Sequence, residues 1–221
     1  MKLKSKWDLA IFDCDGVLVD SEALTHESLV MALTELGVDI DIRKAMALFM
    51  GNTLAQSIAV IEGLLGAPLP DNFFPEWREL LYAHLRAAPV KAVPGVTELI
   101  DALDIPYCVV SNGPVRKMQT TLGVTGLLDR FEGRIYSSES GLPGKPAPDL
   151  FLAAARDFDA DPRRTFVIED SPKGVTGAVA AGMQAFGFAA AEYIDAAELA
   201  NAGATVFNDM RALPGLLKVY G

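Results

Sequence analysis

Short hydrophobic runs rich in β-branched and aromatic residues recur along the chain and predict the strands of a sheet. They lie at Trp7–Phe12, Tyr107–Val110, Arg134–Tyr136, Thr165–Ile168, Gln184–Phe188 and Thr205–Phe207. Helical periodicity fills intervals between the later runs, as at Asp149–Phe158 and Val175–Ala181. Strands that alternate with helices are typical of an α/β fold, so we expect a doubly wound parallel sheet with helices on both faces.

The first interval between strands is much longer than this alternation requires. Seventy-eight residues separate Gly16 from Gly95, whereas an ordinary βαβ unit takes about 30 in total. We interpret the interval as helices alone, separated by glycine and proline breakers. The expected helices are Glu22–Leu36, Ile42–Phe49, Thr53–Leu65 and Asn72–Arg86. We therefore expect an all-helical domain at residues 18–87, inserted into a core of residues 1–17 and 88–221, with hinges near 17–20 and 88–94.

Composition and charge limit the class of protein. The 221 residues are 51% hydrophobic and 22% charged, enough for one full domain and a smaller one with a substantial core. No hydrophobic run approaches the roughly 18–20 residues of a membrane span, and the basic N-terminus lacks the hydrophobic segment of a signal peptide. We expect Cys14 and Cys108 to be free thiols of a cytoplasmic protein.

The net charge of −10 disfavours nucleic acids and anionic membranes as partners. It still allows a small anionic ligand, provided that local cations overcome the overall field. We expect the partner to be a small phosphorylated metabolite and the chain to be a monomer or a weak homodimer.

Two carboxylates follow the first predicted strand directly. The hydrophobic run Leu9-Ala10-Ile11-Phe12 leads into Asp13-Cys14-Asp15-Gly16. Two carboxylates this close together ionise cheaply only beside a cation. In such a position the first could act as a nucleophile and the second could transfer protons. A calcium-binding EF-hand loop is excluded, because its glycine would stand elsewhere and no hydrophobic run would follow.

Three further segments carry polar groups of related kinds. Ser111-Asn112-Gly113-Pro114 follows a strand and offers a hydroxyl and backbone N–H groups, with Pro114 at the expected first helical position; it could cradle an anion or simply cap the helix. Lys145 stands in a proline-rich loop and could be either an aimed cation or a solvated side chain. Glu169-Asp170 follows a strand, and Asp170 could alternatively be a helix cap.

The charges of these segments would need to be balanced if they converge. Asp13, Asp15, Glu169 and Asp170 together carry −4, and a phosphate would add up to −2. Unit charges about 4 Å apart interact by roughly 4 kcal/mol at an effective dielectric constant of 20. Mg²⁺ and Lys145 would supply +3, and protonation of one carboxylate another +1. Because hard oxygen ligands suit Mg²⁺, we expect a magnesium site that handles an anion.

The four motifs resemble, in their order along the chain, those of the haloacid dehalogenase superfamily. They are Asp13–Glu22, Ser111–Gly113, Lys145-Pro146 and Glu169–Ser171. The helical insertion is similar to the cap of that superfamily's first structural subclass. The resemblance implies a Rossmann-like core and a cap that closes over the site and excludes water.

The resemblance also implies a role for each residue. Asp13 would be the nucleophile that forms an aspartyl-phosphate, and Asp15 would protonate the leaving oxygen and then activate water. Mg²⁺ would be bound by Asp13, the Asp15 backbone carbonyl and Asp170, with Glu169 binding directly or from the second sphere. The groups expected to hold the phosphoryl oxygens or the rest of the substrate are Ser111, Asn112, Gly113, Lys145 and Glu22, joined by His26 and the loop Phe49–Thr53.

Within the superfamily, the motifs favour a phosphatase. Asp15 argues against a dehalogenase, because a leaving halide needs no proton. A β-phosphoglucomutase-type mutase shares all four motifs, but its cap arginine has no counterpart in segment 49–54, and its cap histidine corresponds to Thr25, one place before His26. Segment 108–119 resembles phosphatases of sugar and sugar-acid phosphates, such as 6-phosphogluconate or hexose phosphates. The alternatives are the mutase and a non-catalytic Mg²⁺- or phosphate-binding protein.

Overall fold

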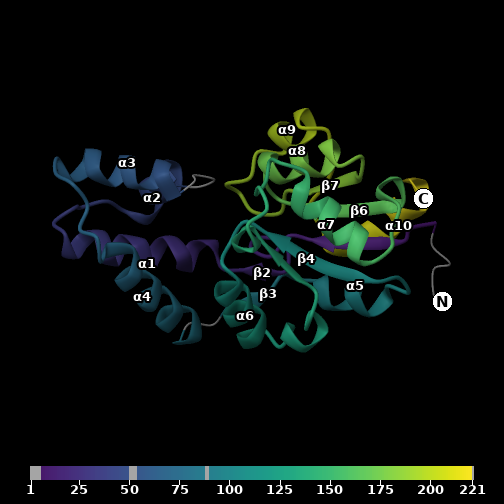
Figure 1. Cartoon of the computed structure of the whole chain (residues 1–221), viewed down its shortest axis with the longest axis horizontal. Coiled ribbons are helices and arrows are strands. Elements are labelled where there is room, and N and C mark those ends of the chain that lie inside the picture. Colours follow the sequence, from purple (N-terminus) through teal and green to yellow (C-terminus); the bar gives the residue numbers. More distant parts are fainter. Residues whose placement is uncertain (1–5, 50–53, 88–89, 221) are drawn as a thin grey trace. The chain divides into compact units, whose positions relative to one another are not determined.

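The computed structural model describes residues 6–49, 54–87 and 90–220, which form two compact units. The first unit runs to Asp20 and resumes at Lys91, and the second unit extends from Ser21 to Val90. Figure 1 shows the first unit as strands and helices and the second as helices alone. Both boundaries of the second unit lie three residues beyond the predicted positions 18 and 87.

The first unit is built on a six-stranded sheet in which every pairing is parallel. Its strand order is β5-β4-β1-β6-β7-β8. The strands are β1 (Leu9–Phe12), β4 (Tyr107–Ser111), β5 (Ile135–Ser137), β6 (Thr165–Glu169), β7 (Gln184–Phe188) and β8 (Thr205–Phe207). All six match a predicted hydrophobic run, so the expected α/β fold with a doubly wound parallel sheet is confirmed.

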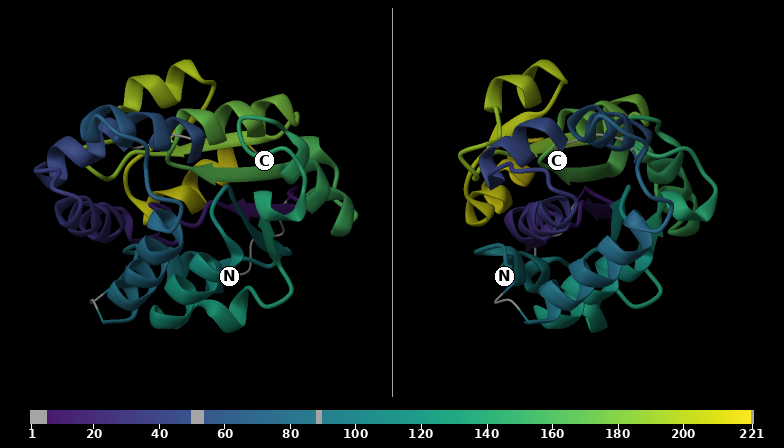
Figure 2. Two further views of the ribbon diagram at one scale, coloured as in Figure 1. Left: turned by 60° about the vertical axis from the view of Figure 1, so that its left-hand side comes forward. Right: turned by 90° about the vertical axis from the view of Figure 1, so that its left-hand side faces the viewer.

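Helices cover both faces of this sheet (Figures 1 and 2). The helices of the first unit are α5 (Val96–Ala102), α6 (Val115–Val124), α7 (Asp149–Asp157), α8 (Pro172–Ala180), α9 (Ala196–Asn201) and α10 (Leu213–Tyr220). Helices α5 and α6 lie on one face, and α7 and α8 lie on the other. Right-handed crossovers require this arrangement, because the chain moves toward β5 through α5 and α6 and toward β8 through α7 and α8.

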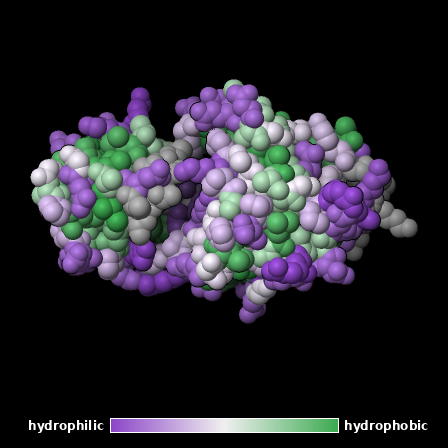
Figure 3. Space-filling model, turned by 45° about the horizontal axis from the view of Figure 1, so that its top comes forward, coloured by the Kyte–Doolittle hydropathy of each residue, from purple (hydrophilic) through white to green (hydrophobic). Residues whose placement is uncertain are grey.

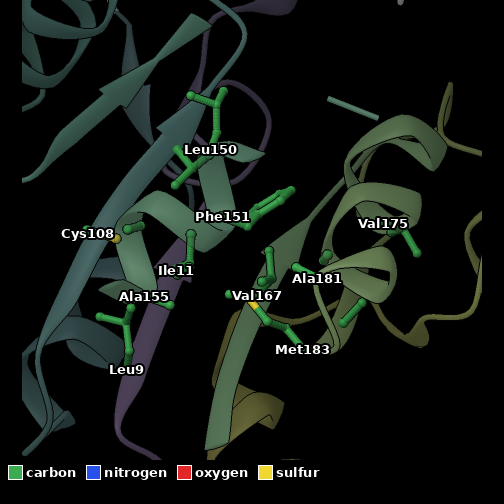
Figure 4. Packing of buried hydrophobic residues seen from close by; sticks show 14 of the residues in the cluster. Leu9, Ile11, Cys108, Leu150, Phe151, Ala155, Val167, Val175, Ala181 and Met183 are labelled. Carbon is green, nitrogen blue, oxygen red and sulfur yellow. The ribbon is translucent and has the colours of Figure 1, made fainter. Parts of the chain in front are cut away.

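The core between the sheet and α7 and α8 is hydrophobic and closely packed. Strand β1 is buried along its whole length, as expected for a central parallel strand covered on both faces. Figure 4 shows Ile11 of β1 and Val167 of β6 together with Phe151 of α7, all of them fully buried. On the face of the molecule drawn in Figure 3, hydrophobic surface residues are interspersed with hydrophilic ones.

A short two-stranded ribbon stands where the chain leaves and re-enters the first unit. Strands β2 (Val19–Asp20) and β3 (Lys91–Ala92) pair antiparallel, with Val19 opposite Ala92. We expected only helices between Gly16 and Gly95, and this expectation was wrong at both ends. Two-residue strands are too short to show a period-2 pattern, and their partners lie about 70 residues apart in the sequence.

The second unit contains four helices in its described part: α1 (Glu22–Glu35), α2 (Ile42–Phe49), α3 (Leu54–Leu65) and α4 (Phe73–Ala87). Its own hydrophobic core includes Leu33, Phe49, Ile61 and Phe73. The predicted helices agree within one residue, except that Thr53 lies outside the described residues. None of the described helices, in either unit, has the length and hydrophobicity needed to cross a membrane.

The start of α8 approaches the end of β6 closely, and a glycine makes this approach possible. A Cβ atom at Gly174 would lie 1.9 to 2.1 Å from the three carboxyl atoms of Glu169, whose side chain is fully buried. No side chain larger than hydrogen fits at that distance. The position of Glu169 therefore depends on Gly174.

We predict that Gly174→Ala destabilises the protein, because overpacking of a buried site costs roughly 1–3 kcal/mol. Urea denaturation should report a free energy of unfolding lower by at least this amount. Gly215→Ala is the matched control: Gly215 is exposed in α10 with nothing within 4 Å of an added Cβ, so alanine should raise stability by up to about 1 kcal/mol. Equal stability of wild type and Gly174→Ala would contradict the close approach.

Candidate active site

The carboxyl ends of three neighbouring strands bring the predicted motifs together in the first unit. Asp13 follows β1, Ser111 ends β4 and Glu169 ends β6, and these strands are adjacent in the sheet (Figure 1). The Asp13 N–H donates to the Ile168 carbonyl at 2.9 Å, which extends the pairing of β1 and β6 to the first carboxylate. Crevices at the carboxyl ends of parallel strands are the usual ligand sites of such sheets.

Lys145 is the cation at the centre of this group. Its side chain is buried, and its Nζ donates to Asp13 Oδ1 at 2.5 Å, to the Val110 carbonyl at 2.7 Å and to Glu169 Oε1. These three acceptors match the three N–H donors of an ammonium group. Lys145 is therefore an aimed cation, and the alternative of a solvated loop lysine is wrong.

The burial of this cluster changes the acidity of its members. Burial raises the pKa of Asp13 to about 7, with Lys145 acting in the opposite direction and Glu169 adding to the increase. Burial alone would lower the pKa of Lys145, but Asp13 and Glu169 together raise it above its usual value. Lys145 is thus charged at neutral pH, and further positive charge beside Asp13 would keep its carboxylate ionised.

The side chain of Asn112 anchors the loop that carries Lys145. Asn112 Nδ2 donates to the Lys145 carbonyl at 2.9 Å, and the Lys145 N–H donates to Asn112 Oδ1 at 2.7 Å. The close approach needs Gly144, where a Cβ would lie 2.6 Å from Asn112 Oδ1. We expected Asn112 to bind phosphate. Its amide group is used in this way, and a phosphate contact by Asn112 stays a prediction.

Ser111 and Gly113 form a tight turn at the end of β4. The Gly113 N–H donates to Ser111 Oγ at 3.0 Å, and Ser137 Oγ donates to the Gly113 carbonyl at 2.7 Å. The N-cap of α6 is Pro114. No side chain of this segment makes a cap hydrogen bond to α6, so the alternative that the segment simply caps the helix through a side chain is wrong. The placement of Pro114 at the first helical position, which Val115 occupies, is also wrong.

Glu169 and Asp170 face different partners. Glu169 Oε2 accepts hydrogen bonds from Ser171 Oγ at 2.9 Å and Ser171 N at 3.3 Å, while Oε1 accepts from Lys145. The cap of α8 is Ser171, whose Oγ accepts from Gly174 N, so the alternative of Asp170 as the cap is wrong. Asp170 instead lies against Gly16, where a Cβ would be 1.9 Å from Asp170 Oδ2; the φ of 76° also favours glycine.

The oxygen donors fit a hard divalent cation. No three His, Cys, Asp or Glu side chains of the described residues form a ready-made metal cluster. The ligand set implied by the resemblance is Asp13, Asp170 and the Asp15 carbonyl, with Glu169 binding directly or from the second sphere, and Mg²⁺ usually keeps several waters. Asp170 reaches the residue next to Asp15, which is consistent with this set. Glu169 already accepts three hydrogen bonds, from Lys145 and Ser171, and its direct binding to the metal stays a prediction.

Lys117 is a charged residue of this site that our sequence analysis did not single out. It lies on α6, and its Nζ is 3.0 Å from Asp15 Oδ2. The buried residues of α6 are Lys117, Met118, Thr121 and Leu122, which lie on one face of a helix. The signal available in the sequence was the position of this lysine on the hydrophobic face of a predicted helix.

Glu22 is a predicted site residue that belongs to the second unit, as do His26 and the loop Phe49–Thr53. It begins α1, and its Oε2 lies 3.6 Å from His26 Nδ1. A substrate contact by Glu22 or His26 stays a prediction. Of the loop Phe49–Thr53, residues 50–53 lie outside the described residues.

Comparisons with known proteins agree with this arrangement. Residues 7–182 match the model of a family described as haloacid dehalogenase-like hydrolase. A 6-phosphogluconate phosphatase of Escherichia coli (strain K12) is 30% identical over 217 residues, which cover 98% of this chain and 97% of that protein.

Solved structures of similar proteins cover nearly the whole chain. A conserved haloacid dehalogenase-like protein of unknown function from Agrobacterium tumefaciens superimposes with a TM-score of 0.83 and 36% identity, covering 96% of this chain and 98% of that one. A HAD family hydrolase from Deinococcus radiodurans with bound phosphate and sodium superimposes with a TM-score of 0.80 and 29% identity, covering 99% of this chain and 98% of that one. The strand-end cluster and these similarities lead to one conclusion: the chain belongs to the haloacid dehalogenase-like hydrolases and is an enzyme of that family.

Proposed function

We propose that the protein is a Mg²⁺-dependent phosphatase that hydrolyses a sugar or sugar-acid phosphate through an aspartyl-phosphate intermediate. The observation that carries this proposal is the buried Asp13 carboxylate held by Lys145 at the carboxyl edge of the sheet. The similarity of the chain, over nearly its whole length, to a 6-phosphogluconate phosphatase supports the substrate class. The bound phosphate of the Deinococcus radiodurans neighbour supports phosphate as the ligand.

The first half of the reaction uses Asp13 and Asp15. An oxygen of Asp13 attacks the phosphorus atom, and the bond between phosphorus and the bridging oxygen breaks. The electron pair of that bond stays on the leaving oxygen, which takes the proton of Asp15. Ser111 and Lys145 are the groups proposed to hold the phosphoryl oxygens, and Lys145 would exchange one of its three present acceptors for such an oxygen. Mg²⁺, held by Asp13, Asp170 and the Asp15 carbonyl, would neutralise negative charge on the phosphoryl group.

The second half returns the enzyme to its starting state. The oxygen of a water molecule attacks phosphorus, one proton of that water passes to Asp15, and the bond between Asp13 and phosphorus breaks. Inorganic phosphate leaves, Asp13 is again a carboxylate and Asp15 is again protonated. Each half requires Asp15 to carry a proton in one direction and Lys145 to remain charged, which its raised pKa supports.

The proposal extends to the role of the cap, the cellular compartment and the oligomeric state. Residues 18–87 would select the substrate through Glu22 and His26. The two cysteines are free and buried, which supports a cytoplasmic location. A monomer or weak homodimer that acts on a small metabolite, with neither nucleic acid nor membrane as a partner, accords with the charge of −10.

The test is phosphate release from a panel containing 6-phosphogluconate, hexose 6-phosphates and β-glucose 1-phosphate, measured with Mg²⁺ and with excess EDTA. We expect release concentrated on one or two sugar or sugar-acid phosphates, loss of this activity in EDTA and its return on adding Mg²⁺. Isomerisation of β-glucose 1-phosphate without net release would indicate a mutase. Absence of turnover with every compound would contradict an enzymatic role on this class.

Asn112→Ala should lower kcat about 10- to 100-fold, because it removes both hydrogen bonds that orient Lys145 and a displacement near 1 Å can cost that much. Steady-state kinetics on the best substrate of the panel measures this. Ser138→Ala is the matched control: Ser138 Oγ donates to the Asn112 carbonyl at 2.8 Å but does not orient Lys145 through the amide group. It should keep most of the activity. Wild-type kcat in Asn112→Ala would refute the anchoring role.

A further inference from the structure

A second buried lysine lies at the site, and none of the roles above uses it. Lys117 is 9% exposed, and the side chains of Lys117 and Asp15 are 11% and 14% exposed. Surface ion pairs of the same unit differ clearly: in the pair of Arg163 and Asp161 the exposed fractions are 84% and 36%. An ammonium group loses hydration on burial and is retained only where a partner compensates for it. Asp15 is such a partner.

The contact falls on the side of Asp15 that faces the turn Ser111–Gly113. A Cβ atom at Gly113 would lie 3.4 Å from Ser111 Oγ and 3.9 Å from Asp15 Oδ2. Asp15 Oδ2 is also the atom 3.0 Å from Lys117 Nζ. Both α6 and the loop that carries Asp15 belong to the first unit, so this contact is made within a single compact body.

Lys117 is well placed to hold a fixed position. It lies in the first turn of α6, its N–H donates to the Pro114 carbonyl at 3.0 Å, and Met118 and Thr121 beside it are fully buried. Thr121 Oγ1 in turn accepts from or donates to Cys14 Sγ at 3.9 Å. Helix α6 is therefore attached to the Asp13–Gly16 loop at two points, through Lys117 to Asp15 and through Thr121 to Cys14.

We propose that Lys117 is a positioning residue for the acid–base carboxylate. Its ammonium group holds Asp15 at Oδ2 and so fixes the orientation in which this carboxyl group passes the proton to the leaving oxygen in the first half of the reaction and takes the water proton in the second. This inference rests on the proposed function. The bonds made and broken are those of the two half-reactions above, and Lys117 keeps its own protons throughout.

The way in which the rate of each step depends on the leaving group distinguishes a positioning role of Lys117 from a substrate-binding or a structural one. A sugar alkoxide is a strong base and needs the proton of Asp15 as it leaves, whereas p-nitrophenolate is a stable anion and leaves without one. Breakdown of the aspartyl-phosphate needs Asp15 whichever group has left. A misplaced Asp15 therefore slows the first step only for sugar phosphates and slows the second step for both compounds.

The experiment compares wild type, Lys117→Met and Lys117→Arg, with Lys218→Met as the control at an exposed position of α10. Stopped-flow absorbance follows p-nitrophenyl phosphate, and phosphate release follows 6-phosphogluconate. We expect Lys117→Met to give a stoichiometric burst of p-nitrophenolate at the wild-type rate, then turnover slowed about 10- to 100-fold. Turnover of 6-phosphogluconate should fall by a similar factor with little change in KM. Lys117→Arg should recover part of the loss, and Lys218→Met should behave as wild type.

Two kinetic results would overturn the proposal. A raised KM with unchanged kcat for both compounds would make Lys117 a substrate-binding group. An equal loss of burst rate and turnover would make it merely structural. Lys117→Gln replaces Lys117→Met if the latter does not fold.

A readout without turnover separates failure of this inference from failure of the proposed function. If wild type hydrolyses neither these two compounds nor any other compound of the panel, the proposed function fails, and crystal structures of wild type and Lys117→Met decide the positioning role alone. We expect the Asp15 carboxylate to adopt a different rotamer in the variant. An unchanged Asp15 rotamer would overturn the inference.

Discussion

The ammonium group of Lys145 is the interaction on which the candidate site depends. It compensates two buried carboxylates, Asp13 and Glu169, and also binds the carbonyl of Val110. The first acceptor directly follows β1, and the other two lie at the carboxyl ends of β6 and β4, so one side chain joins three neighbouring strand ends. Loss of one partner in a buried ionic group typically costs about 3–5 kcal/mol, because an uncompensated charge remains. The position of Asp13 therefore depends on the same contacts as the packing of this edge of the sheet.

The sheet creates the conditions for this interaction. Strand β1 is central, with Phe12 beside Val109 on one side and Ile168 on the other. A parallel register therefore carries the next residues of each strand to the same edge. Loops then adjust what the strands bring together: Asn112 fixes the main chain at Lys145, and Gly174 lets α8 start directly over Glu169. The result is a rigid cation between two carboxylates, the preorganised electrostatics that phosphoryl transfer requires.

The parts predictable from the sequence are those that a local pattern encodes. Hydrophobic runs identified the six strands, and the polar residues directly after three of them identified Asp13, Ser111 and Glu169. The side-chain partners were not predictable in this way. Nothing local shows that Asn112 holds Lys145, 33 residues away, or that Val19 pairs with Ala92. Lys117 was detectable in principle, because it lies on the buried face of α6, but a lysine is normally assigned to solvent.

The central claim is that Asp13 carries the phosphoryl group during turnover, and covalent trapping tests it most directly. Acid quenching during turnover of the preferred substrate, followed by peptide mapping in a mass spectrometer, should find one phosphoryl group on the peptide that contains Asp13. Asp13→Asn should show neither label nor turnover. Asp8→Asn, at the other end of the same strand and paired with Arg164, should show both. Turnover without label on Asp13, or retained turnover in Asp13→Asn, would contradict the account.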